Sequence, residues 1–222
     1  MTVETEVRIV EARAEHAPFV AWVALTAFRS HLEKGFWDFM LEEDDEAGNL
    51  HYLETLATTE QLHWSHYSTF IVAEVNGTPA AALCGYQEKE FGSTAGEPIQ
   101  VAGMEANAKT GRTEKQAAEG FARAMSVMNV IPEHVEGAWI VENVATLPEF
   151  RRRGLVDRLM AEIIERGRAR GASTADISVF IGNDPAQRAY EKCGFEAIGE
   201  KRDAAFEAAY KTPGIRTLRR AI

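Results

Sequence analysis

Two hydrophobic patterns alternate along this chain. Apolar residues at every third or fourth position indicate helices, and short continuous apolar runs indicate buried strands. Phe19, Val20, Val23, Ala24 and Ala27 show the first pattern clearly. The predicted helices cover residues 14–30, about 50–63, 113–130 and 152–170, with a shorter one from Asp184 to about Cys193.

The apolar runs are separated by turn residues. Asn76 and Gly77 lie between two such runs, and this pair favours a tight hairpin because both turn positions need a positive φ. The predicted strands cover residues 7–10, 70–75, 79–86, 138–146, 175–181, 195–201 and 214–220.

Several helix ends are marked by particular residues. Thr113 can cap a helix with Gln116 three positions later, and Gly171 is suited to end the helix over 152–170. Asp184 is expected to be a cap, with Pro185 at the first helical position. The last helices alternate with strands, which predicts an α/β fold with a mixed sheet that contains a parallel pair.

Residues 88–112 follow neither pattern well. They are rich in Gly, Ala, Thr and charged residues, so we expect an irregular segment or lid, with a strand near residues 99–104. With the helix that follows, this segment makes an insertion at about 88–135. The chain has no internal repeat or linker, so we expect one domain over residues 1–222.

Composition narrows the function classes. The chain has 222 residues, 45% hydrophobic and 26% charged, which is typical of a globular protein. We expect no membrane span and no signal peptide, because no apolar run is long enough and the first residues are polar. Only Cys84 and Cys193 are cysteines, which fits the reducing cytoplasm better than a disulfide framework.

Charge is negative overall and unevenly distributed. The net charge is −10, which argues against nucleic acid as the main partner. Residues 151–222 carry 15 Lys and Arg against 10 Asp and Glu, whereas residues 1–150 carry 9 against 24. The acidic part could attract a cationic substrate, or it could simply keep the protein in solution.

The segment from Val144 to Val156 carries the clearest chemistry. It reads as the end of a strand, a turn at Pro148, then three arginines and a glycine that open a helix. Amide groups in a first helical turn lack intrahelical partners, and arginines beside them add charge and forked donors. This arrangement predicts a site for an anion, and a diphosphate is the natural ligand.

These residues resemble the GNAT acyltransferase superfamily. Arg151-Arg152-Arg153-Gly154-Leu155-Val156 is similar to its acyl-CoA motif Arg/Gln-x-x-Gly-x-Gly/Ala, although Val156 adds bulk where the family has a small residue. A second motif is similar to Asn-x-x-Ala-x-x-x-Tyr-x-x-x-Gly-Phe, and it comprises Asn183, Ala186, Tyr190, Gly194 and Phe195. The resemblance implies a central mixed sheet flanked by helices, in which two splayed parallel strands hold CoA.

The resemblance also implies roles for individual residues. The pantetheine arm of acetyl-CoA would pair with strand backbone, and Asn183 would bond it while Ala186 leaves room. The diphosphate would be held by the arginines and the backbone of the loop, where Gly154 allows a close approach. The expected acyl-CoA-binding residues are Val144, Ala145, Thr146, Arg151, Arg152, Arg153, Gly154, Leu155, Val156, Asn183 and Ala186.

Two residues are candidates for acid–base catalysis. In the family, a tyrosine at the position of Tyr190 can protonate the leaving thiolate, and a phenol is protonated at neutral pH. The family often uses a strand glutamate or an ordered water as the base, which makes Glu142 a candidate. Strand alternation alone leaves open whether Glu142 faces inward.

The resemblance implies an acetyl-CoA-dependent N-acetyltransferase that needs no metal. The alternative is a non-catalytic acyl-CoA-binding sensor or regulatory module of the same fold. The acceptor could be a small amine or a peptide, and a homodimer stays open. The acceptor site could be lined by residues 63–67 and by three aromatic residues, Phe36, Trp37 and Phe39. These residues could instead merely pack in the core.

Overall fold

The computed structural model describes residues 6–43 and 45–222. Residues 1–5, which belong to the polar first residues that speak against a signal peptide, and Asp44 lie outside the described residues. The strands are β1 (Val7–Glu11), β2 (Phe70–Val75), β3 (Thr78–Tyr86), β4 (Trp139–Thr146), β5 (Thr174–Phe180), β6 (Glu196–Arg202) and β7 (Gly214–Ala221). The helices are α1 (Ala17–Arg29), α2 (Phe36–Leu41), α3 (Glu46–Ala57), α4 (Glu88–Phe91), α5 (Glu97–Lys109), α6 (Glu114–Ser126), α7 (Leu155–Ala169), α8 (Asp184–Lys192) and α9 (Ala204–Tyr210).

The strands form one mixed sheet in the order β1-β2-β3-β4-β5-β7-β6. β4 and β5 are parallel, and every other neighbouring pair is antiparallel. The hairpin predicted at Asn76-Gly77 joins β2 and β3, with positive φ at both residues. The mixed α/β fold with one parallel pair is therefore confirmed.

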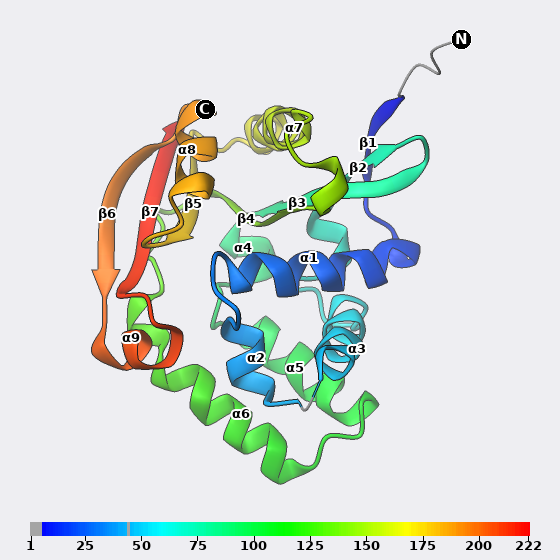
Figure 1. The fold of residues 1–222 in the computed structure, drawn as a ribbon, viewed down its shortest axis with the longest axis vertical. Helices are drawn as coiled ribbons and strands as arrows, with labels where there is room; N and C mark the ends of the chain where they lie inside the picture. The colour runs from blue at the N-terminus through cyan, green and yellow to red at the C-terminus, as the bar shows by residue number, and fades with distance from the viewer. Residues whose placement is uncertain (1–5, 44) are drawn as a thin grey trace.

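Helices cover both faces of the sheet (Figure 1). α7 packs on β2, β3 and β4 from one side, and α1 packs on β3 and β4 from the other. Alternate residues of β2 serve the two layers: Phe70 and Val72 join the core under α1, whereas Ile71 and Ala73 join the core under α7. This alternation is what a strand buried on both faces requires.

β3 and α7 approach closely at Gly85. A β-carbon on Gly85 would lie 2.5 Å from Cγ1 of Ile163 and 2.6 Å from Nε1 of Trp139. Only a glycine fits at this point without moving its neighbours. The close contact fixes the position of α7, whose first turn carries the arginine loop.

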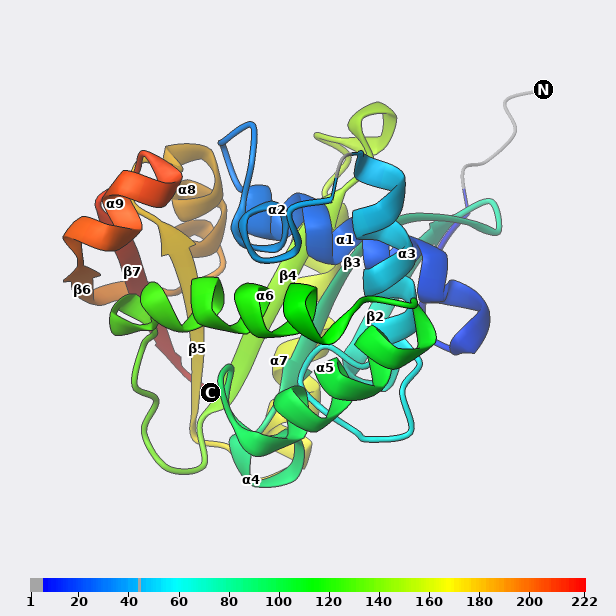
Figure 2. The same cartoon turned by 90° about the horizontal axis from the view of Figure 1, so that it is seen from below.

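The segment between β3 and β4 differs from its prediction. The strand expected near residues 99–104 is wrong, because these residues lie within α5, and most of the supposedly irregular segment is helical. Pro98 in the first turn starts α5, and the small buried residues Ala102 and Ala106 lie one turn apart. α5 packs on α3 and α6 packs on α2, on the α1 side of the sheet (Figure 2).

Other helix boundaries also differ. α3 begins at Glu46 and not at Leu50, because the Asp45 side chain accepts a hydrogen bond from the Gly48 N–H at 2.9 Å. The cap of α8 is Asn183 and not Asp184. The box of Thr113 and Gln116 at the start of α6 is confirmed. No helix of the described ranges is both long and apolar enough to cross a bilayer.

β4 contains an irregularity that shapes the site. Its register with β3 shifts between Ala82 and Cys84, and Asn143 takes a left-handed φ of 55°. Asparagine tolerates this conformation better than most residues. β4 pairs with β5 only as far as Val141, opposite Ile177. Beyond that pair the two parallel strands diverge, which leaves an opening in the sheet.

Candidate active site

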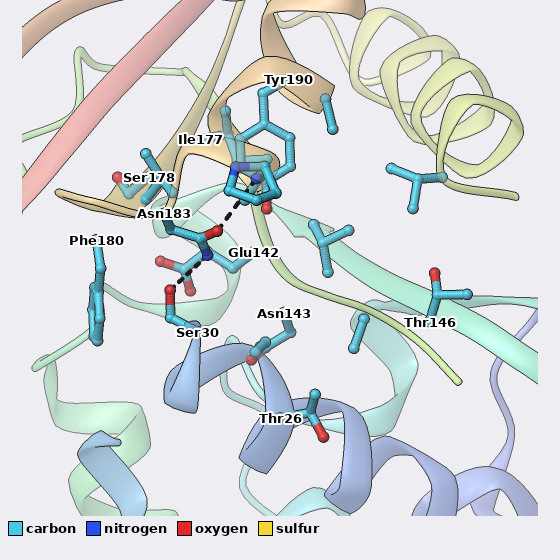
Figure 3. A pocket seen from close by; sticks show the side chains of 18 of the residues that line it. Thr26, Ser30, Glu142, Asn143, Thr146, Ile177, Ser178, Phe180, Asn183 and Tyr190 are labelled. Carbon is cyan, nitrogen blue, oxygen red and sulfur yellow. Dashed lines mark hydrogen bonds between the residues drawn. The ribbon is translucent and has the colours of Figure 1, made fainter. Parts of the chain in front are cut away.

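A cavity of about 820 Å³ lies where β4 and β5 diverge. Its walls come from the end of α1, the second half of β4, the loop before α7, the end of β5 and α8. Figure 3 shows Glu142, Asn143 and Thr146 from β4 with Tyr190 from α8 around this space. Of the predicted site residues, all but Arg153 line the cavity.

The loop before α7 is built to present backbone amides. Arg152 and Gly154 have left-handed φ values of 60° and 72°, which turn the chain sharply into the helix. Arg158 donates the first helical backbone bond, to the Gly154 carbonyl at 3.2 Å. The amides of Leu155, Val156 and Asp157 precede that bond and have no acceptor within the helix. This end of the cavity is therefore suited to an anion.

The three arginines of the loop lie differently. Arg151 and Arg152 line the cavity, and Nε of Arg151 donates to the Thr146 carbonyl at 3.3 Å. The Arg153 guanidinium lies over the Phe150 ring at 5.1 Å and donates to the Glu149 carbonyl at 2.9 Å. Arg151 and Arg152 thus border the cavity and Arg153 does not, and the role of all three as phosphate contacts stays a prediction.

The residues predicted along the pantetheine arm lie on the wall of the cavity. Val144, Ala145 and Thr146 follow the last β4–β5 pair, so the β4 edge that faces β5 has no strand partner there. An edge of this kind can accept an extended ligand as an added strand. The side chain of Val156 also lines the cavity beside the first helical turn.

Asn183 connects α8 to the end of α1. Its Oδ1 accepts from the Ala186 N–H at 3.3 Å, and its Nδ2 donates to Oγ of Ser30 at 2.7 Å (Figure 3). An asparagine amide has two donors and two acceptor positions, so one of each remains beyond these bonds. Asn183 can therefore bond a ligand amide while it holds this corner of the cavity together.

Glu142 lies in the cavity beside the divergence of the strands. Tyr86 donates a hydrogen bond from its hydroxyl to Oε2 of Glu142 at 3.3 Å. Burial raises the pKa of Glu142 to about 7, although the positive charge of His134 and the bond from Tyr86 oppose the rise. A carboxyl group with this pKa changes protonation near neutral pH, as a general base should.

A buried ion network lies close to Glu142. Nδ1 of His134 lies 2.9 Å from Oδ2 of Asp176, and the Arg219 guanidinium bonds both oxygens of Asp176 at 2.6 and 2.8 Å. Asp176 is fully buried, and these partners hold its pKa below the usual value against the effect of burial. Asp176 thus stays ionised and orients the His134 ring.

Tyr190 faces the cavity from α8. It is buried, and burial raises the pKa of its phenol above the ordinary value. The hydroxyl therefore keeps its proton at neutral pH. A buried, protonated phenol beside the opening in the sheet can donate a proton to a leaving group.

Comparison with known sequences agrees with this geometry. The sequence model of the acetyltransferase (GNAT) family matches residues 36–195, which is more than half of the chain. The chain belongs to the acetyltransferase (GNAT) family. No curated protein matches it in sequence.

Solved structures show the same GNAT fold. One acetyltransferase superposes with a TM-score of 0.69 at 18% identity, over 97% of this chain and 99% of that one. An N-acetyltransferase from Staphylococcus aureus Mu50 gives 0.66 at 18% identity, over 96% and 99%. A polyamine N-acetyltransferase from Drosophila melanogaster gives 0.53 at 15% identity, over 98% and 100%. At these identities the likeness concerns the fold.

The histidines of residues 63–67 are structural in this GNAT protein. His63 is buried, its Nδ1 accepts from the Ser65 N–H at 3.1 Å, and its Nε2 lies 3.0 Å from the Leu56 carbonyl. Burial lowers the pKa of His63 to about 4, so the ring is neutral. Nδ1 of His66 lies 2.7 Å from Oγ of Ser68. In the described ranges no three His, Cys, Asp or Glu side chains gather as metal ligands would.

The aromatic residues divide between two places. Phe36, Trp37 and Trp64 line a second cavity of about 450 Å³ next to the first. Phe39 instead packs edge-on against Tyr210, with ring centroids 5.4 Å apart. Phe36 and Trp37 therefore line a cavity, whereas Phe39 packs against another aromatic ring.

Sequence reasoning missed the groups that surround Glu142. Tyr86 and His134 lie 56 and 8 positions away from it, and neither belongs to a motif. Asn143 did carry a signal, because an asparagine inside an apolar strand is typical of a bulge with positive φ. Its Nδ2 lies 3.4 Å from Sγ of Cys84, which anchors the bulge to β3.

Proposed function

We propose that this chain is an N-acetyltransferase that transfers the acetyl group of acetyl-CoA directly to an amine. The observation that carries the proposal is that Glu142 and Tyr190 line the same cavity as the loop from Arg151 to Val156. The proposed proton acceptor and proton donor therefore lie in the same cavity as the predicted anion site.

Donor binding would use both ends of the cavity. Arg151, Arg152 and the amides of the first turn of α7 would hold the diphosphate, with Gly154 allowing the close approach. The unpaired edge over Val144–Thr146 would bond the pantetheine amides, with Asn183 opposite. These groups suit the charge of a diphosphate and the extended form of the arm. Leu155, Val156 and Ala186 would supply the apolar surface around them.

The chemistry would use one proton acceptor and one proton donor. Glu142, in its ionised form, would take a proton from the ammonium group, directly or through a water molecule. The free amine would form a bond to the thioester carbon, and a backbone N–H near Val144 would stabilise the oxygen that becomes negative. Tyr190 would protonate the sulfur as its bond to carbon breaks, and the second proton lost by the nitrogen would pass to the phenolate and restore Tyr190. The products would be the amide and the CoA thiol.

We further propose that the chain forms one domain with the α4–α6 segment as its insertion. A cytoplasmic location is supported by Cys84 and Cys193, which are both free thiols. The proposed partners are acyl-CoA and a small amine or peptide, and a homodimer would be compatible with them. The proposed reaction uses no metal, and the proposed partners include neither a nucleic acid nor a membrane.

Acetyl transfer to a panel of amines tests the proposal. The panel includes butylamine, 2-phenylethylamine, agmatine, spermidine and a short peptide. Thiol release is followed with a chromogenic disulfide, and mass spectrometry identifies the acetylated amine. We expect amine-dependent thiol release and an acetylated product. Tight acetyl-CoA binding with no transfer to any amine would support the non-catalytic acyl-CoA-binding module instead.

A further inference from the structure

The second cavity lies between α2, α3, α5 and α6, and most of its lining is apolar. It measures about 450 Å³, a size typical of small-molecule sites. Its inner wall is aromatic: Phe28 packs edge-on against Trp37 at 5.8 Å, and Trp37 stacks on Trp64 at 6.5 Å between ring centroids. These contacts join the three rings into one aromatic wall.

This cavity continues the proposed active site. Phe28, Thr94 and Ile131 line both cavities, so they mark the border between the two spaces. The Thr94 carbonyl accepts a bond from Nε1 of Trp64 at 3.3 Å, which fixes the border to the aromatic wall. A molecule that extends from Glu142 past these residues would enter the second cavity.

The rim of the second cavity exposes large apolar side chains. Met104 on α5 and Phe121 and Met125 on α6 line the cavity, and they are 64%, 52% and 45% exposed. Exposed apolar side chains around a hollow are typical of a ligand-binding groove. The rim would then be the entrance for the ligand.

Charge limits what this cavity can hold. Arg112 is the one charged residue among the described residues that line it. Its guanidinium is paired with Glu43, donates to the Leu41 carbonyl at 3.0 Å and lies 5.8 Å from the centroid of the Tyr52 ring. The lining offers no carboxylate to a cationic group, so a polyamine chain would lose its hydration there without an ionic partner.

We propose that the second cavity binds the apolar body of the acceptor, which is a primary amine on an uncharged aliphatic or aromatic body. This inference rests on the proposed N-acetyltransferase function. The amino group lies toward Glu142, and the body passes Phe28 and Thr94 to reach the aromatic wall. The negative charge of the first part of the chain attracts the ammonium head, and the cavity selects the body.

A series of straight-chain amines tests the proposal. Butylamine, hexylamine and octylamine are compared with 2-phenylethylamine, agmatine and spermidine, with acetyl-CoA as donor. Each methylene that becomes buried should raise kcat/KM by about fourfold until the cavity is full. Agmatine and spermidine should be poorer than hexylamine. A flat series, or a preference for the polyamines, would overturn the proposal.

Two substitutions on one helix locate the effect. Ala117 lines the second cavity, whereas Ala122 is exposed on α6 and does not line it. Ala117→Phe should lower kcat/KM for octylamine at least tenfold more than it lowers kcat/KM for butylamine. Ala122→Phe adds the same bulk to the same helix and should retain the wild-type series. Equal behaviour of the two variants would contradict the assignment.

Other occupants give different results. If the cavity held a long acyl chain, Ala117→Phe would reduce turnover of octanoyl-CoA and leave the amine series intact. If a second copy of the chain covered the rim, light scattering would show a dimer that Ala117→Phe dissociates, again with an intact amine series. Either result would overturn the proposal. Folded wild-type protein that transfers acetyl to no amine would instead reject the proposed function.

Discussion

The Tyr86 hydroxyl donates a hydrogen bond to the Glu142 carboxylate across the β3–β4 pair, at 3.3 Å. Tyr86 is fully buried and stacks on Trp64, with ring centroids 6.4 Å apart. The bond therefore joins the proposed general base to the aromatic wall of the second cavity. It also opposes the rise in pKa that burial causes at Glu142.

The wild-type kcat should rise with pH near neutrality, and Glu142→Gln should abolish this step in the kcat profile. Glu142 must be ionised to accept a proton, so kcat in the wild type should rise as pH passes its pKa of about 7. The variant should be slower by about 100-fold or more and should lack that step. The measurement is kcat at saturating amine from pH 5.5 to 9. A variant with a wild-type rate would remove Glu142 from the mechanism.

Glu142→Gln should also change stability in a pH-dependent way. The folded-state pKa of Glu142, about 7, lies above its ordinary value of 4.5. The native protein therefore holds this proton more tightly than the unfolded chain, and this stabilisation is lost as pH rises from about 4.5 through about 7. The variant should have a higher Tm than the wild type at pH 8 and a similar one at pH 4.5. The opposite order would contradict the raised pKa.

Tyr86→Phe should move the same step to higher pH. Removal of the hydroxyl removes a bond that favours the ionised carboxylate, so the pKa of Glu142 should rise further. The pH at which kcat rises should increase by up to about one pH unit. The affinity for acetyl-CoA should stay unchanged. A positioning role of this kind moves the profile, whereas a purely structural role would lower kcat equally at every pH.

Tyr190→Phe should lower kcat by about 10- to 1,000-fold if Tyr190 protonates the leaving thiolate. Calorimetry should show little change in acetyl-CoA affinity, because the ring remains. Tyr210→Phe is a matched control, since Tyr210 is 3% exposed and lies outside both cavities. An unaltered rate in the Tyr190 variant would assign the ring to packing.

Gly85→Ala should destabilise the fold by about 1–3 kcal/mol. The added β-carbon would lie within 2.6 Å of Ile163 and Trp139, so α7 and β3 would have to separate. Gly199→Ala on β6 is the control, because a β-carbon there meets nothing within 4 Å. Urea unfolding measures both variants. Equal stabilities would mean that this contact does not fix the position of α7.

Local patterns predicted several elements well. The apolar run of β2, the Asn76-Gly77 hairpin, the turn at Pro148 and the cap of α6 all depend on neighbours in the sequence. α5 was mistaken for a strand because Ala102 and Ala106 are small and the helix has little apolar contrast between its faces. α2 and α9 are short helices held by tertiary packing, which local periodicity does not reveal.

Site residues were predictable where a motif or the family resemblance pointed to them. The loop from Arg151 to Val156 and the residues Asn183 and Tyr190 came from motifs, and the structure brings most of them to one cavity. The pKa of Glu142 depends on Tyr86 and His134, which the fold brings near from other segments. The second cavity likewise needs four helices whose packing no single segment specifies.

Calorimetric titration with acetyl-CoA tests the central claim most directly, namely that the divergent strands and the arginine loop hold acyl-CoA. Desulfo-CoA and ATP serve as controls for the pantetheine arm. We predict micromolar binding that ATP does not reproduce and that Arg151→Ala and Arg152→Ala weaken more than Arg153→Ala. No binding of acetyl-CoA to the folded wild type at millimolar concentration would contradict the account.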